Sequence, residues 1–106
     1  MLIPDLQRAI DRAREGVDAI EELGRARAEA ERDYRVALRK AVLGLRARGM
    51  PASVASDAAR GQEEVARLAF ERDCAQAVYD ANYEALLLAK KEAGLIEAQV
   101  EREWRG

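Results

Sequence analysis

Apolar side chains between residues 6 and 45 recur at steps of three and four residues, the spacing that brings them to one face of an α-helix. This stripe consists of Leu6, Ile10, Ala13, Val17, Ile20, Leu23, Ala26 or Ala30, Tyr34, Ala37, Ala41 and Leu45. It predicts one helix over residues 4–48. Two successive steps of three, from Val17 to Leu23, depart from the regular alternation and predict that a coiled coil is locally overwound there.

Residues 49–61 interrupt the helical pattern. Basic residues followed by Gly49 are typical of a helix end, and Pro51 prevents the helix from continuing because it lacks a backbone N–H and clashes with the preceding turn. The small residues that follow predict a turn with a short helix, which Ser53 caps at its start and Gly61 ends.

A second long helix is predicted over residues 62–104, with acidic residues in its first turn that complement the helix dipole. Between residues 74 and 89 apolar side chains also occupy other faces of this helix, so one seam against the first helix does not cover all of them. The stripe that forms the seam consists of Val65, Leu68, Arg72, Ala75, Tyr79, Asn82, Leu86, Ala89, Ala93, Ile96 and Val100.

Together these elements predict an all-α fold, with one domain over residues 1–106 formed by a long antiparallel helical hairpin similar to a coiled coil. Because an extensive uncovered apolar surface marks an interface, we expect a homo-oligomer. Its simplest form is a two-fold dimer that makes a four-helix bundle, and a higher oligomer is the other form. The alternative is that a short helix at residues 52–60 folds back over this surface.

The residues expected in the oligomer interface are Val78, Ala81, Asn82, Ala85, Leu87 and Leu88. Asn82 stands at a seam position, where a buried asparagine fixes the register and the number of helices at some cost in stability. The leading hypothesis is therefore a non-enzymatic helical assembly or interaction protein.

The composition narrows the function classes. Apolar residues make up 49% and charged residues 36% of the chain, a balance typical of folded proteins, and the net charge is −2. Histidine, the commonest general base and a frequent metal ligand, is absent, so we expect neither an enzyme nor a cofactor or metal site. The single cysteine, Cys74, is expected to be a buried small apolar residue. Without a long apolar run, we expect no membrane association and a cytoplasmic location.

Basic residues gather where the chain reverses direction. Residues 34–62 contain six basic side chains against the single acid Asp57, a net charge of +5. Such a basic tip can contact nucleic acid phosphates, which makes a nucleic-acid-associated accessory protein the first alternative function. No aromatic residues are interleaved with these charges, so base stacking is not supported. The tip consists of Arg35, Arg39, Lys40, Arg46, Arg48 and Arg60.

An enzymatic alternative is a Mg²⁺-dependent all-α nucleotide pyrophosphohydrolase, which holds the ion with acidic residues on facing helices. Such a site needs carboxylates three or four residues apart on one helix face. Glu71 and Asp73 are two residues apart and therefore point in different directions. The spacing does not support this alternative.

Four segments follow one another along the chain. Residues 31–34 belong to a basic helix that carries a tyrosine, residues 49–52 form a Gly-x-Pro turn, and residues 61–65 give the second helix an acidic start. The second helix ends in the motif Glu-x-x-Trp. In this order the segments resemble small uncharacterised α-helical proteins of bacteriophages and prophages. The resemblance covers residues 30–104. It implies a phage- or prophage-encoded cytoplasmic protein, and we expect such a protein to bind itself or another phage or host protein. The shared motifs are structural and imply no activity.

Overall fold

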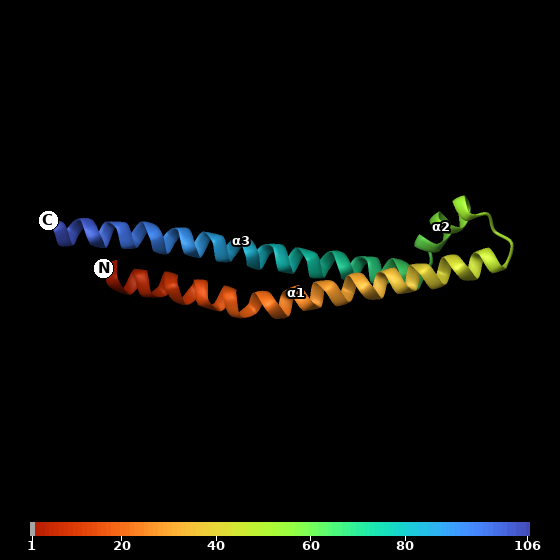
Figure 1. Ribbon diagram of the computed structural model, residues 1–106, viewed down its shortest axis with the longest axis horizontal. Coiled ribbons are helices and arrows are strands. Elements are labelled where there is room, and N and C mark those ends of the chain that lie inside the picture. Colours follow the sequence, from red (N-terminus) through yellow and green to blue (C-terminus); the bar gives the residue numbers. More distant parts are fainter. Residues whose placement is uncertain (1) are drawn as a thin grey trace. The chain divides into compact units, whose positions relative to one another are not determined.

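The computed structural model describes residues 2–106, which form three α-helices and, within this range, no strand (Figure 1). The helices are α1 (Leu2–Ala47), α2 (Ala52–Arg60) and α3 (Glu63–Arg105). The predicted all-α class and helical hairpin are confirmed. Each long helix begins and ends within two residues of the bounds expected from the sequence.

The helices pack as two compact units, each of which pairs a part of α1 with a part of α3 in antiparallel orientation (Figure 1). Unit 1 contains residues 2–23 and 78–106, and unit 2 contains residues 24–77 with α2. The single domain over residues 1–106 that the sequence predicts stays a prediction. Two long paired helices have no common centre, because each residue contacts only neighbours at its own level along the helix axis. The contacts can therefore fall into separate groups.

The end of α1 is fixed by a Schellman motif. Gly49 has a positive φ of 96°, a conformation that favours glycine. Its N–H donates to the Arg46 carbonyl oxygen at 3.0 Å, and the Met50 N–H donates to the Leu45 carbonyl oxygen at 3.2 Å. These two bonds satisfy carbonyl groups that have no partner within the helix.

The start of α2 differs from the prediction. Ser53 lies inside the helix, and the N-cap is Pro51, which makes no side-chain capping hydrogen bond. Pro51 has φ −61° and ψ 148°, and its carbonyl oxygen accepts the N–H groups of Val54 at 3.1 Å and Ala55 at 2.8 Å. The backbone of Pro51 therefore begins the helix without the expected serine cap. Gly61 ends α2, as predicted.

The seam of α1 in unit 1 differs from the predicted stripe at two positions. Ala9 is fully buried next to the half-buried Ile10, and Gly16 faces α3 while Val17 is 49% exposed. With Ala9 and Gly16 in the seam, steps of three and four alternate regularly, so the two successive steps of three on which the overwinding was predicted do not occur in the seam. A search for apolar side chains does not identify glycine as a seam residue, because glycine has no side chain. The same lack of a side chain allows two helices to approach each other closely.

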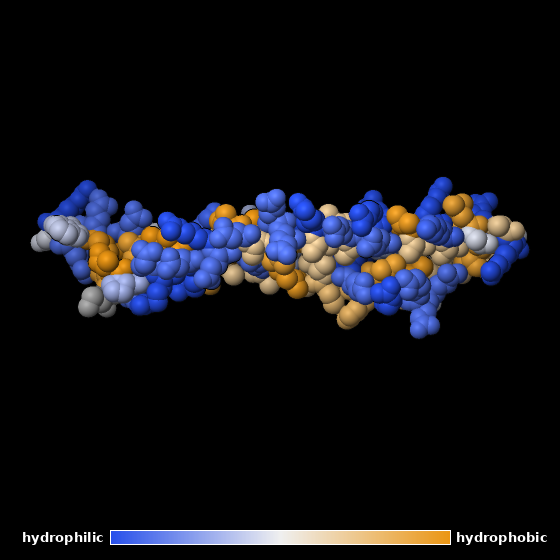
Figure 2. All heavy atoms as spheres, turned by 90° about the horizontal axis from the view of Figure 1, so that it is seen from below, coloured by the Kyte–Doolittle hydropathy of each residue, from blue (hydrophilic) through white to orange (hydrophobic). Residues whose placement is uncertain are grey.

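The stripe predicted on α3 is confirmed, because each of its positions from Val65 to Val100 is buried or half-buried. Cys74, predicted to be buried, is exposed, since the seam passes through Arg72 and Ala75 on either side of it. The buried core of residues 2–106 is thin and consists of Ala9, Ala55, Ala59, Val65, Leu86 and Ala89. Twelve larger apolar side chains of the same range remain exposed, and Figure 2 shows apolar surface between polar groups.

Candidate interaction surface

Gly16 on α1 and Leu86 on α3 mark a close approach of the two helices in unit 1. A Cβ atom added to Gly16 would lie 3.1 Å from Leu86 Cβ and 3.2 Å from Leu86 Cδ1. Both distances are shorter than the optimal van der Waals separation of two carbon atoms. One helical turn before Leu86, Asn82 Nδ2 donates a hydrogen bond of 3.2 Å to the Gly16 carbonyl oxygen. This directional contact and the close approach together fix the register of α1 against α3 in unit 1.

An ion pair lies on one side of this contact. Arg12 Nη2 is 2.7 Å from Glu92 Oε1, and both side chains are about half exposed. At such exposure an ion pair contributes about 1 kcal/mol or less to stability. The pair borders a groove of about 490 Å³ in unit 1, which Ala85 and Leu88 also line. The groove thus has charged groups at its rim and apolar side chains within it.

An apolar stripe runs from this groove along the outer face of α3. Its residues follow one another at steps of three, four, three and seven, which keeps them on one side of the helix, about 100° around the axis from the seam. All are exposed, with Val78 at 52%, Leu88 at 66% and Leu95 at 64%. We call this set the α3 stripe: Val78, Ala81, Ala85, Leu88 and Leu95. Residues 52–60, the alternative cover for this surface, form α2 and belong to unit 2.

Four of the six residues predicted for the oligomer interface belong to the α3 stripe. Leu87, which is 44% exposed, points about 100° away from Leu88 and shares a face with Tyr83 instead. Asn82 is half-buried in the seam, where its amide group is bonded within the chain. Leu95 extends the stripe beyond residue 89, where the predicted surplus of apolar residues on α3 ends. Its distance of seven residues from Leu88 was the signal that could have found it.

A second apolar surface lies where the ends of α1 and α3 meet in unit 1. Trp104 is 84% exposed there, and it lines a shallow pocket of about 380 Å³ with Leu2, Ile3, Val100 and Glu103. The pocket contains one charged side chain and no cluster of polar groups that would orient a small molecule.

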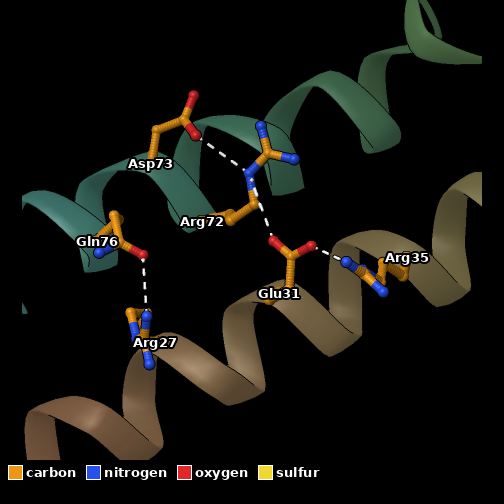
Figure 3. Close-up of polar contacts among 6 residues, drawn as sticks. All are labelled: Arg27, Glu31, Arg35, Arg72, Asp73 and Gln76. Carbon is orange, nitrogen blue, oxygen red and sulfur yellow. Dashed lines mark hydrogen bonds and ion pairs between the residues drawn. The ribbon is translucent and has the colours of Figure 1, made fainter.

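In unit 2, polar contacts connect α1 and α3 where the α3 seam carries Arg72 (Figure 3). The Arg72 guanidinium lies over the Tyr34 ring, 4.2 Å from its centroid, and Arg72 Nε is 3.7 Å from Glu31 Oε2. The same Nε donates a hydrogen bond of 3.1 Å to Asp73 Oδ1. The hydrogen bond to Asp73 is the main cause that raises the pKa of Arg72 above its usual value. These contacts explain how a charged residue occupies a seam position.

The six residues of the predicted basic tip are all exposed and all belong to unit 2. Two of them bind neighbours on their own helix. Arg35 Nε donates to Glu31 Oε1 at 2.7 Å (Figure 3), and Arg60 Nη1 donates to Ser56 Oγ at 3.4 Å. The other four have no acidic residue three or four positions away in the sequence, and they are Arg39, Lys40, Arg46 and Arg48.

Arg67 pairs with two acidic residues of α3. Its Nη2 and Nη1 donate to Glu64 Oε1 and Glu71 Oε1, each at 2.6 Å. The hydrogen bond from Arg67 lowers the pKa of Glu64 below its usual value. Within residues 2–106, no three His, Cys, Asp or Glu side chains are arranged to hold a metal ion.

No α-helix in the described part of the chain, residues 2–106, combines the length and the apolar character needed to cross a membrane. No family model matches the sequence, and no curated protein or solved structure is significantly similar to it.

Proposed function

We propose that this chain is a non-enzymatic assembly protein that associates with other helices through unit 1, most simply with a second copy in a four-helix bundle. The observation that carries the proposal is the exposed α3 stripe, whose side chains have the spacing of a helix–helix seam. A helix of a stable globular fold normally buries an apolar face wider than one seam. In unit 1, α3 already uses its seam against α1, and the stripe would complete that wider face.

The side chains involved are large enough to favour association. Full burial of one leucine side chain contributes about 1.5–3 kcal/mol. In a two-fold dimer, Leu88 and Leu95 are each buried once in each copy, so each contributes its burial energy twice. The buried core within the chain is made mostly of alanines, which contribute less. Association would therefore supply a substantial share of the apolar burial of unit 1.

Sedimentation equilibrium across the micromolar range tests the proposal. We expect the wild-type chain to dimerise and Leu88→Gln to raise the dissociation constant at least tenfold, since a polar amide would replace an apolar contact. Leu87→Gln is the matched control, because it makes the same change one residue away on another face of α3. A wild-type chain that remains monomeric at all concentrations would refute the proposal, and equal effects of the two variants would refute the role of the stripe.

Nucleic acid binding through unit 2 is the second candidate function. Four basic residues without acidic helical neighbours support it, because such side chains are free of the local pairing that neutralises a surface. A salt-dependent gel shift with single- and double-stranded DNA tests it on a variant with the four residues Arg39, Lys40, Arg46 and Arg48 changed to Ala. A control variant removes four positive charges from unit 1, at Arg8, Arg14, Arg102 and Arg105. Absence of a shift at low salt, or equal shifts for both variants, would refute this function.

The resemblance of residues 30–104 to small phage proteins supports a phage or prophage origin, a cytoplasmic location, and another phage or host protein as a further partner. The genes beside the coding sequence test this origin. Phage structural, replication or lysogeny genes on both sides are the expected finding, and a conserved bacterial operon would contradict it.

A further inference from the structure

Two side chains of opposite charge lie along one edge of the α3 stripe, the edge farther from the seam with α1. Glu84 and Lys91 are both exposed and stand seven residues apart, so they lie on the same face of α3. The residues three and four positions from Glu84 and from Lys91 include no charge of opposite sign. By contrast, Arg67 at the start of α3 has acidic partners at both of these distances. Glu84 and Lys91 therefore have no partner along their own helix.

We infer that the α3 stripe binds the α3 stripe of a second copy, with the two α3 helices antiparallel about a two-fold axis that passes between Ala85 and Leu88. This inference rests on the proposed function and adds the partner, the orientation and the register. The groove beside the stripe, in unit 1, leaves room for the side chains of the second helix.

The register follows from the sizes of the side chains. In an antiparallel pair with this axis, Ala85 of one copy opposes Leu88 of the other, and Val78 opposes Leu95. Each large leucine thus meets a smaller residue, which is the alternation that lets two helices interdigitate. Ala81 opposes Glu92, whose carboxylate is held at the rim by Arg12 at 2.7 Å, so that its apolar stem can cover the alanine.

The charges select the same arrangement. In the antiparallel register, Glu84 of each copy lies beside Lys91 of the other, and two-fold symmetry repeats this contact. A parallel two-fold pair would instead bring each charge level with the identical charge of the second copy. The two residues that lack partners along α3 thus satisfy each other only when the helices run in opposite directions.

Charge reversal tests this register on the full chain. Sedimentation equilibrium at low salt is expected to show that Glu84→Lys and Lys91→Glu each raise the dimer dissociation constant about tenfold, because each creates two repulsive pairs. The double variant is expected to return to within about threefold of wild type. An equimolar mixture of the two single variants is expected to form a heterodimer, because all of its cross-pairs are of opposite charge.

Lys90 and Glu97 provide the matched control. They carry the same charges at the same spacing on the side of α3 turned away from the stripe. Lys90→Glu and Glu97→Lys are therefore expected to leave the dissociation constant unchanged. Circular dichroism at 222 nm verifies that every variant keeps its helix content.

The outcomes separate this inference from the proposed function. A wild-type dimer that responds to neither single reversal, or whose affinity is not recovered in the double variant and the mixture, overturns the antiparallel register but leaves self-association intact. A wild-type chain that is monomeric throughout overturns both. Equal responses at the control positions also overturn the register, because they would show only an effect of net charge.

Discussion

Replacement of Gly16 by alanine has two opposing effects on the free energy of unfolding. A glycine inside a helix costs about 1 kcal/mol relative to alanine, so the substitution gains helix propensity. The new Cβ would, however, lie 3.1 Å from Leu86 Cβ and 3.2 Å from Leu86 Cδ1. Both distances are shorter than the optimum of about 3.5–4.0 Å between carbon atoms. The helices of unit 1 must then separate by a few tenths of an ångström.

Gly94 is the matched control for the gain in propensity. It lies inside α3 in the same unit, and an added Cβ would meet no atom within 4 Å. We therefore expect Gly94→Ala to raise the free energy of unfolding by about 1 kcal/mol. Overpacking of a fitted contact costs about 1–3 kcal/mol, so Gly16→Ala is expected to be neutral or to destabilise by up to about 2 kcal/mol. Separation of the helices would also lengthen the hydrogen bond from Asn82.

Urea unfolding followed by circular dichroism at 222 nm measures the difference between the two variants. Both are measured at several protein concentrations, because dimerisation adds to the apparent stability. A gap of about 1–3 kcal/mol in favour of Gly94→Ala is expected. If Gly16→Ala stabilises the protein as much as Gly94→Ala does, α1 and α3 do not approach closely at this position.

Asn82→Ala removes the hydrogen bond to the Gly16 carbonyl and is expected to lower the free energy of unfolding in urea by about 1 kcal/mol, and an unchanged value would contradict the bond. Gly49→Ala is expected to cost about 1–2 kcal/mol in the same assay, because φ of 96° is strained for alanine. The pKa of Glu64 is lowered in the folded state, so its pairing contributes stability above the usual value of 4.5 and loses it as the pH falls through the folded-state pKa. Glu64→Gln should therefore destabilise at pH 7, with a difference from wild type that disappears on acidification; a constant difference would contradict the pairing. In hydrogen exchange, backbone amides of residues 78–99 are expected to gain protection as protein concentration rises, and uniform protection across the chain would contradict association through the stripe.

Much of the helical hairpin could be predicted because its signals are local. The residues of the α3 seam recur at steps of three and four, and every predicted seam position on α3 is buried or half-buried. The end of α1 could be predicted as well, since Gly49 and Pro51 act through their own backbone chemistry. Such features depend on residues within one or two turns of each other.

Features that depend on the fit between two helices could not be predicted. The choice of Gly16 over Val17 for the seam is set by how closely α3 approaches, which no single-helix pattern contains. The separation of Leu87 from Leu88 is different, because the seam predicted on α3 already places these two residues on different outward faces. The α3 stripe is the exposed face that contains Leu88.

The contrast between the two units gives the physical reason to expect a partner at unit 1. Unit 2 contains α2 as a third element, and Ala55 and Ala59 of that short helix are fully buried. Unit 1 contains parts of α1 and α3 alone within residues 2–106, and the α3 stripe lies there, exposed. Two helices in contact cover one face of each other, whereas a third element can cover a second face. A second copy of the chain would supply to unit 1 the helical cover that α2 supplies within unit 2.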